Sequence, residues 1–353
     1  ETIVQALRAS GSADNTLVVF TSDNGYLLGE HRYQGKILGY EEALGYAVGS
    51  EVRDKDGISA AVLFAEVAAV AAADGRTLQE WLDDIAARYG GEEFAAMLRA
   101  ERPIAAGQSY WLEELTWMEV RDLIRSGTRT VIIPTGGIEE NGPYLATGKH
   151  NLILEGLCPA IAENLANALC APIVKFVPEG DIYPPTGSML FPGTISLSEA
   201  TYEALLIDIG SSLKQSGFTD VVFIGDSGGN QVGMNKAAAM LNQQWAGSGT
   251  QFHFVGEFYD PGWVATEDYT RQVLGVDETG NDGYHDDIWV TAMMMVSDPN
   301  HVRYSERVAA GLDSINGVKI SPLAETIQLG RDMIAFRASY TADAIREAIA
   351  DNE

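Results

Sequence analysis

The chain has 353 residues, of which 46% are hydrophobic and 21% are charged, a balance typical of a soluble globular protein with two or three domains. Fifty acidic residues against 23 basic ones give a formal net charge of −27. This charge disfavours nucleic acids and anionic membranes as partners, because neither counterion release nor attraction to anionic lipid would support binding.

The first hundred residues predict one strand followed by helices. A buried strand is expected over 16–22 (TLVVFTS), and a turn at 53–57 (RDKDG) precedes two helical segments joined at 74–77 (DGRT). A third helical piece follows. The longest apolar run, 58–73, is interrupted by a glutamate and is shorter than the roughly 18 uninterrupted apolar residues of a membrane span. A packed helix is therefore expected there.

The N-terminus shows no features of a secretory signal, since neither a charged n-region nor an apolar h-region opens the chain. A cytoplasmic location is therefore expected, although a chain that begins with Glu1 rather than Met can have lost residues upstream. Cys158 and Cys170 are the only cysteines. They are too few for a zinc-thiolate knot, and a structural disulfide between them is not expected.

Strand and helix signals alternate from residue 107 onward. Strands are expected over 129–137, 171–178, 220–229 and 250–260, and helices over 117–127, 152–169, 197–217 and 231–245. Such alternation predicts an α/β fold with a mainly parallel sheet and helices on both faces.

Polar residues follow each of the expected strands. They are Glu139, Glu140, Asn141, Glu179, Asp181, Asp226, Ser227, Glu257 and Asp260. Sites in parallel sheets form at the carboxyl ends of the strands, so we expect these side chains to meet. The acids among them would repel one another unless a cation lies between them. The spacing thus predicts a functional site that contains a cation.

Ser227 lies in a glycine-rich turn, GDSGG, over 225–229. The string occurs around the active serine of trypsin-like proteases, but those are antiparallel barrels, and here it lies between a strand and a helix. It also fits the G-x-S-x-G nucleophile elbow of α/β-hydrolases. In that alternative His285 is the base, and the orienting acid is one of Asp260, Asp286 and Asp287, of which only the first satisfies the chain order Ser, Asp, His.

Residues 107–335 resemble the creatininase (creatinine amidohydrolase) family. The resemblance is carried by LEELTWMEVRDLIRSGTRTVIIPTGGIEENGPYLATGKHN, FPGTISLSEATYEALL, GFTDVVFIGDSGGNQ and GYHDDIWVTAMMM. It implies a creatininase-like three-layer α/β/α domain over 105–353. It also implies hydrolysis of amides or cyclic amides through a metal-activated water, a small-molecule substrate, and a homo-oligomer, commonly a hexamer.

The family's ligands can be placed on this sequence one position at a time. In the family a glutamate, a histidine two residues later, an aspartate before a helix and a histidine after the third strand bind two divalent metals, usually zinc or manganese. These positions are Glu139, Asn141, His150 and Ser227 here. The family's later-loop histidine, which acts in proton transfer, is kept as His285. The usual two-metal cluster is therefore incomplete.

The resemblance and the acid spacing together predict one zinc or manganese ion with an open water position. The expected ligands are Glu139, His150 and Asp226, with Asp287 as a candidate fourth. His285 would move the proton to the leaving nitrogen, while Lys149 and Ser227 would contact the substrate or an oxyanion. Asn141, Trp263 and Trp289 are further candidate substrate-binding residues. The alternatives are the serine hydrolase above and an inactive relic of the fold.

The N-terminal segments resemble other families. Residues 1–42 are similar to a sulfatase (arylsulfatase) segment, in which Asp23 and Asn24 would help bind calcium and Lys36 would contact sulfate, but the C-x-P-x-R nucleophile motif is absent. Residues 41–103 are similar to a phosphomannomutase or phosphoglucomutase, without its phosphoserine and metal loops. We therefore expect a fusion of fragments with boundaries at 1–42, 43–104 and 105–353, in which the first two form a fragmentary α+β segment.

Overall fold

The computed structural model describes residues 38–41, 45–48, 99–102, 105–281 and 283–350. The chain divides into two compact units, 1–101 and 102–353. In the first unit the described strands β1 (Leu38–Glu41) and β2 (Gly45–Val48) form an antiparallel pair. The other predictions for this unit, including Asp23, Asn24 and Lys36, lie outside the described residues.

The second unit is built on a four-stranded parallel sheet. Its strands are β3 (Thr130–Thr135), β4 (Ala168–Cys170), β5 (Asp220–Gly225) and β6 (Gln251–Phe254), in the order β4-β3-β5-β6. Thr130 pairs with Ala168 on one side and with Asp220 on the other. All six residues of β3 are buried, as expected for a strand covered on both faces. The predicted parallel α/β fold is confirmed.

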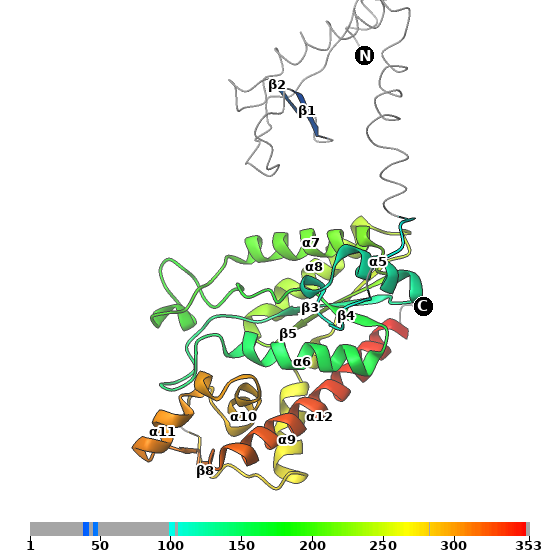
Figure 1. Cartoon of the computed structure of the whole chain (residues 1–353). Helices are drawn as coiled ribbons and strands as arrows, with labels where there is room; N and C mark the ends of the chain where they lie inside the picture. Colours follow the sequence, from blue (N-terminus) through cyan, green and yellow to red (C-terminus); the bar gives the residue numbers. More distant parts are fainter. Residues whose placement is uncertain (1–37, 42–44, 49–98, 103–104, 282, 351–353) are drawn as a thin grey trace, which may run out of the picture. The chain divides into compact units, whose positions relative to one another are not determined.

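Alternate strand residues face two separate helical layers (Figure 1). Val131, Ile133 and Phe223 pack in the core that also contains residues of α5 (Trp117–Ser126), α7 (Glu199–Ser216) and α8 (Gln231–Gln244). Ile132 and Val222 pack in the core with α6 (Lys149–Leu165), α10 (Ile288–Ser297) and α12 (Leu323–Ala350). The result is the three-layer α/β/α arrangement.

Smaller elements complete the second unit. They are α9 (Gly262–Gln272), α11 (Tyr304–Ala310), the strands β7 (Ser314–Ile315) and β8 (Val318–Lys319), and 3-10 turns at Leu112–Glu114, Gly187–Leu190, Gly228–Asn230, Gly256–Phe258 and Pro299–Val302. Among the described residues, no helix has both the length and the apolar character needed to cross a membrane.

The region around β4 differs from the expectation. The helix expected to run to residue 169 ends at Leu165, because Ala166 adopts a left-handed conformation with φ 65°, and 168–170 then pair with β3. Over the expected strand 171–178, only isolated bridges form, at Val174 and Val177. Pairing with β3, which the local sequence does not encode, therefore decides where this strand lies.

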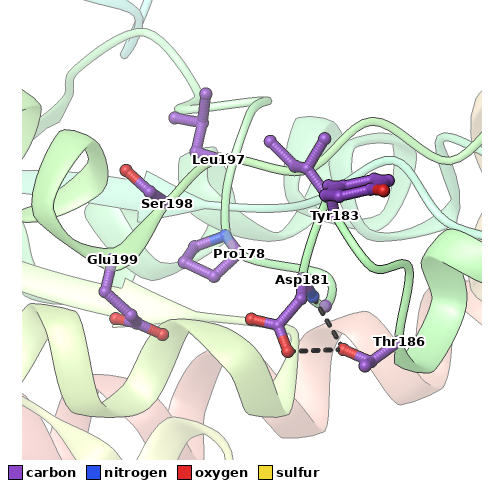
Figure 2. A pocket seen from close by; sticks show the side chains of 9 residues that line it. Pro178, Asp181, Tyr183, Thr186, Leu197, Ser198 and Glu199 are labelled. Carbon is purple, nitrogen blue, oxygen red and sulfur yellow. Dashed lines mark hydrogen bonds between the residues drawn. The ribbon is translucent and has the colours of Figure 1, made fainter.

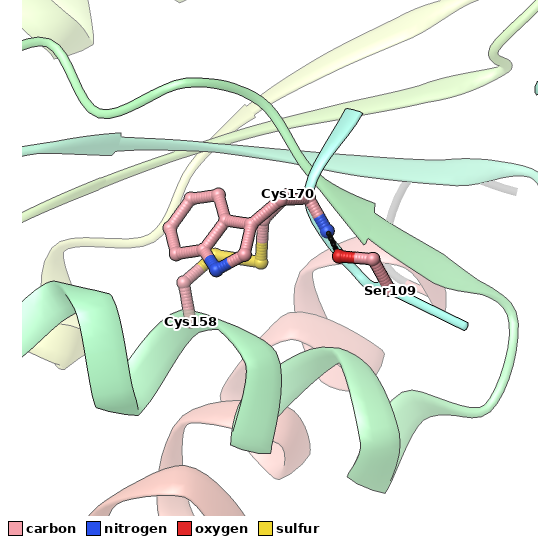
Figure 3. Close-up of a disulfide and its surroundings, with 4 residues drawn as sticks. Ser109, Cys158 and Cys170 are labelled. Carbon is pink, nitrogen blue, oxygen red and sulfur yellow. Dashed lines mark hydrogen bonds between the residues drawn. A yellow bond between two sulfur atoms is a disulfide. The ribbon is translucent and has the colours of Figure 1, made fainter. Parts of the chain in front are cut away.

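The expectation that no disulfide forms is wrong. Cys158 of α6 and Cys170 of β4 are disulfide-bonded, with their Cα atoms 6.2 Å apart (Figure 3). Both side chains are fully buried. The chain reverses after α6, so β4 returns beside the helix that precedes it and brings the two thiols together. Trp111, which bridges to Cys170 and bonds to Ser109 Oγ, lies beside this pair.

Candidate functional site

Three predicted site residues meet at the carboxyl ends of β3 and β5. His150, in the first turn of α6, has its Nδ1 2.7 Å from Asp226 Oδ2 and its Nε2 2.7 Å from Glu139 Oε1. Asp226 directly follows β5, and its backbone N–H donates to Thr135 O at the end of β3. All three side chains are buried. Of the polar residues expected to meet after the strands, Glu139 and Asp226 are thus joined through His150.

The glycine-rich turn around Asp226 is required by close packing. A Cβ atom at Gly225 would collide with Met234, and one at Gly229 would collide with the backbone oxygen of Pro178. Asn230 fixes the turn, since its side-chain amide donates to Thr135 O and Gly136 O at 3.0 and 2.9 Å. The glycines of GDSGG therefore allow β5 to end against its neighbours and hold Asp226 in place.

Two basic side chains, one from α6 and one from α12, also lie in the site. Lys149 Nζ lies 3.9 Å from Glu139 Oε1, and Arg337 Nη2 of α12 lies 2.8 Å from Asp226 Oδ1. Arg337 also donates to Phe258 O at 3.2 Å and lies over the Phe258 ring. Burial alone would raise the pKa of Asp226, but Arg337 and His150 hold it below the ordinary value. Sequence reasoning missed Arg337, because no motif surrounds it.

Glu139 and Glu179 are two carboxyl groups whose pKa values are shifted in opposite directions. Burial raises the pKa of Glu179 to about 8, assisted by the negative charge of Glu139. Burial acts in the same direction on Glu139, but the hydrogen bond and charge of His150 outweigh it and lower the pKa to about 2. Ser227 Oγ donates to Glu179 Oε2 at 3.3 Å, and Ser188 Oγ donates to Glu139 Oε2 at 2.9 Å. At neutral pH one carboxyl is ionised and its neighbour is protonated.

Lys149 is an almost fully buried amine. Burial lowers its pKa, while the surrounding carboxylates, Glu139 foremost, act in the opposite direction. Its Nζ donates to the backbone oxygen of His285 at 3.4 Å and lies 5.9 Å from the centroid of the Trp263 ring. Lys149 was predicted as a substrate contact, and it lies next to the predicted trio.

Aromatic residues flank the cluster on one side. The ring centroid of Trp263 lies 6.4 Å from that of His150, 4.9 Å from Tyr259 and 5.1 Å from Trp289. Within the described part of the chain, the buried atoms Trp263 Nε1 and Asn141 Oδ1 have no hydrogen-bond partner. Such atoms are costly to bury unless something pairs with them. Glu179 Oε1 and Asp226 Oδ1 are also buried without a hydrogen-bond partner, and all four are polar atoms that a bound substrate can satisfy.

Other predicted residues contribute differently from the expectation. The side chain of His285 is exposed, and its backbone oxygen accepts a hydrogen bond from Lys149 Nζ. Asp287 accepts a hydrogen bond from Asn316 at 3.2 Å and precedes α10. The Ser227 hydroxyl bonds to Glu179, not to a histidine. Asn141 Nδ2 donates to Glu139 O at 3.0 Å. These contacts do not assemble the serine–histidine pair of the elbow alternative.

The expected metal ligands do not fit a metal ion in this arrangement. Both ring nitrogens of His150 face carboxylate oxygens at hydrogen-bond distance, whereas a ligating imidazole must present a free lone pair. The second oxygen of Asp226 is paired with Arg337. Over the described residues, no group of three or more His, Cys, Asp or Glu side chains is placed to hold a metal. The predicted set of Glu139, His150, Asp226 and Asp287 is therefore not assembled as a metal centre.

Two cavities lie beside the cluster without being lined by it. One has a volume of about 440 Å³, and its lining includes Pro178 and Gly180, the two neighbours of Glu179 in the chain. The other lining residues are Asp181, Ile182, Tyr183, Thr186, Leu197, Ser198 and Glu199. Figure 2 shows Asp181 bonded to Thr186 at its wall. A second cavity of about 440 Å³ includes Tyr259 and Asp260. The second cavity includes Phe254, the last residue of β6, and so lies at a strand end, where α/β proteins bind ligands.

The fold and the site together define an α/β protein with a buried cluster of acids and basic side chains at the carboxyl ends of a parallel sheet. Residues 113–339 match the creatininase family, described as creatinine amidohydrolase. The chain belongs to this family.

Individual relatives agree with this assignment. Over 124 residues the chain is 27% identical to the mycofactocin precursor peptide peptidase of Mycolicibacterium smegmatis, covering 34% of this chain and 47% of that protein. Over 117 residues it is 27% identical to the creatinine amidohydrolase of Pseudomonas putida, covering 33% and 44%. The chain thus matches a little under half the length of these curated relatives.

A solved structure described as creatininase Mn shares the fold, with a TM-score of 0.52 at 21% identity. The match covers 68% of this chain and 98% of that one. A manganese form is therefore known among the structural neighbours. The creatininase-like three-layer fold expected for the second unit is confirmed.

The N-terminal resemblances are also confirmed. Residues 25–89 match domain III of the phosphoglucomutase/phosphomannomutase family. Sixty residues are 42% identical to a probable phosphomannomutase of Haemophilus influenzae, covering 17% of this chain and 12% of that protein. Forty-five are 47% identical to an arylsulfatase of Chlamydomonas reinhardtii, covering 12% and 7%. The chain therefore combines segments similar to three families.

Proposed function

We propose that this chain is a hydrolase that cleaves a C–N bond in a small-molecule amide, linear or cyclic, with Glu139 and Glu179 as its proton-transfer groups. The observation that supports this most directly is the carboxyl pair itself, with one pKa at about 2 and the other at about 8. Neighbouring groups shifted in opposite directions provide a base and an acid at the same pH. Membership of the creatininase family supports an amide as the substrate class.

In the proposed reaction a water molecule attacks the carbonyl carbon. The ionised Glu139 accepts a proton from this water while the water oxygen bonds to carbon. Glu179 donates its proton to the amide nitrogen, and the C–N bond breaks to release an amine and a carboxylic acid. Transfer of the proton from Glu139 back to Glu179 restores the pair.

Other residues of the site support these steps in the proposal. Lys149 Nζ stabilises the oxyanion that develops on the carbonyl oxygen. The unpaired Trp263 Nε1 and Asn141 Oδ1 offer a donor and an acceptor to the substrate, and Trp289 backs the Trp263 ring. Ser227 holds Glu179 through its hydroxyl, so we assign it a positioning role and not a nucleophilic one.

The metal-activated water and the proton transfer by His285 were both expected from the sequence. A zinc or manganese ion would supply a water of lowered pKa, but both ring nitrogens of His150 face carboxylates and Asp226 is ion-paired with Arg337. No step above therefore passes through a metal. His285 has an exposed side chain, and we propose that it contacts the substrate at the rim of the site.

The test is amine release from a panel of linear and cyclic amides, creatinine included. We expect turnover by the full chain and a loss of about 10²-fold or more in Glu139→Gln and Glu179→Gln. Glu163→Gln, an exposed change in α6, is the matched control and should keep full activity. Loss in Ser227→Ala with activity kept in Glu179→Gln would favour the serine hydrolase. Absence of turnover on every amide would support the alternative that the chain is an inactive relic of the fold.

We also propose that the chain forms a homo-oligomer. Its segment 182–195 exposes large apolar side chains that a monomer would leave in water; these are Ile182, Tyr183, Leu190, Phe191 and Ile195. Exposed apolar residues gathered in one segment are typical of interaction surfaces. Sedimentation of the purified chain should give a mass above that of the 38.0 kDa monomer, and Tyr183→Ser with Leu190→Ser should shift it toward the monomer. A monomeric wild type would contradict this.

A further inference from the structure

Three side-chain cations surround the two ionised carboxylates of the site. His150 lies between Glu139 and Asp226, Arg337 pairs with Asp226, and Lys149 lies beside Glu139. Each of the three cationic side chains is at most 1% exposed. They come from α6 and α12, which lie in one helical layer (Figure 1). The protein itself therefore places positive charge among the acids that follow its strands.

Three carboxylate oxygens of the two acids lie at hydrogen-bond distance from a neighbouring side chain, and the fourth, Asp226 Oδ1, forms an ion pair but no hydrogen bond. Glu139 Oε1 faces His150, and its Oε2 accepts from Ser188. Asp226 Oδ2 faces His150, and its Oδ1 is paired with Arg337. The His150 imidazole can donate to both carboxylates only with a hydrogen on each ring nitrogen. A ring nitrogen that carries a hydrogen has no lone pair for a metal ion, and each of the two acids has a basic side chain beside it.

The altered family positions agree with this arrangement. The family's bridging aspartate is His150 here, so a cation stands where the family has an anion. The two family histidines are Asn141 and Ser227 here, and Asn141 Nδ2 and Ser227 Oγ donate to Glu139 O and to Glu179 Oε2. A divalent ion added to two carboxylates and three cations would meet net repulsion in a buried environment, where charge interactions are strong.

We infer that this chain has replaced the family's metal centre with its own cations, His150, Lys149 and Arg337, and that the site binds neither zinc nor manganese. The inference concerns the site proposed above, but it does not depend on turnover. The substrate would then contact a Lys149 ammonium in place of a metal ion.

Metal content of the full chain tests the inference directly. The purified protein is incubated with Zn²⁺ or Mn²⁺, dialysed, and analysed by plasma mass spectrometry, and its thermal unfolding is followed with and without a chelator. We expect far less than one ion per chain and an unchanged midpoint. One ion or more per chain, or a midpoint that falls on chelation, would overturn the inference, because a ligand that binds only the folded state stabilises it.

A pair of variants separates charge replacement from simple loss of packing. His150→Asp removes the cation and restores the family's acid, so its midpoint should fall and then recover when Mn²⁺ or Zn²⁺ is added. His150→Asn removes the cation without adding an acid, and its midpoint should fall without recovery. Equal stabilisation of wild type and His150→Asp by metal would contradict the inference. Should neither variant fold, the wild-type metal content still decides.

Neither measurement requires a substrate. A chain that is inactive on every amide and free of metal would refute the hydrolase and keep this inference. A chain that is active and loaded with metal would support the hydrolase and overturn this inference.

Discussion

The protonation states of Glu139 and Glu179 depend on what each side chain contacts. Burial raises the pKa of both groups, but only Glu139 has His150 within hydrogen-bond distance. Once Glu139 is ionised, its charge disfavours ionisation of Glu179. A single histidine thus separates two carboxyl groups into a base and an acid.

Glu179→Gln should change how stability depends on pH. A carboxyl with a folded pKa of about 8 and an ordinary value of 4.5 binds its proton more tightly in the folded state. Its contribution to the free energy of unfolding is therefore full below pH 4.5 and is lost as the pH rises to about 8. Urea unfolding at several pH values in this window should show a shallower decline in Glu179→Gln than in wild type. Glu163→Gln should keep the wild-type slope, and equal slopes in all three proteins would exclude this role.

Arg337→Gln should destabilise the fold. The change leaves Asp226, which is fully buried, without its guanidinium partner, and breaking a buried pair costs about 3–5 kcal/mol. The exposed pair of Arg346 and Asp343 provides the control, since Arg346→Gln should cost less than about 1 kcal/mol. Denaturant unfolding measures both. A similar small loss in the two variants would contradict a structural role for Arg337.

The sequence predicted part of this cluster and missed the rest for a physical reason. Glu139, His150 and Asp226 follow strands or open a helix, and parallel topology brings such positions together whatever lies between them. The acids also indicated that a cation must lie among them. Arg337 supplies this positive charge because of how α12 packs in its layer. The sequence around a single arginine in a long amphipathic helix does not predict that packing.

At the scale of elements, local signals set some boundaries and pairing sets others. Thr116 caps α5 in a capping box with Glu119, and Ser198 caps α7, so both helix starts can be predicted from nearby residues. β4 has three residues, too few to produce a sequence pattern. Its position is fixed by hydrogen bonds to β3, which explains why the local pattern predicts the strand at 171–178, after its actual position.

The disulfide between α6 and β4 should contribute to stability. It closes a loop with a sequence separation of 12, for which restriction of the unfolded chain contributes about 2–3 kcal/mol. Cys158→Ala with Cys170→Ala should therefore lower the free energy of unfolding by about this amount. Wild type in strong reductant is the control and should approach the double variant. No difference between oxidised and reduced wild type would show that the bond contributes nothing.

At the scale of the whole chain, the two units differ in how far sequence reasoning reaches. Alternating strands and helices in the second unit predict a parallel sheet, since right-handed crossovers leave few other arrangements. Both hydrophobic cores of the described residues are formed by side chains from Trp111 onward. The segments similar to a sulfatase and a mutase cover only 7% and 12% of those relatives.

Residues 102–353 should therefore fold without the first unit. They form one of the two compact units, and the family match at 113–339 lies wholly within them. Expressed alone, this fragment should unfold cooperatively with a midpoint close to that of the main transition of the full chain, because no buried residue of either core is removed. Calorimetry and near-ultraviolet circular dichroism check this, with the full chain as control. A fragment that aggregates or lacks a cooperative transition would mean that the first unit contributes essential buried surface.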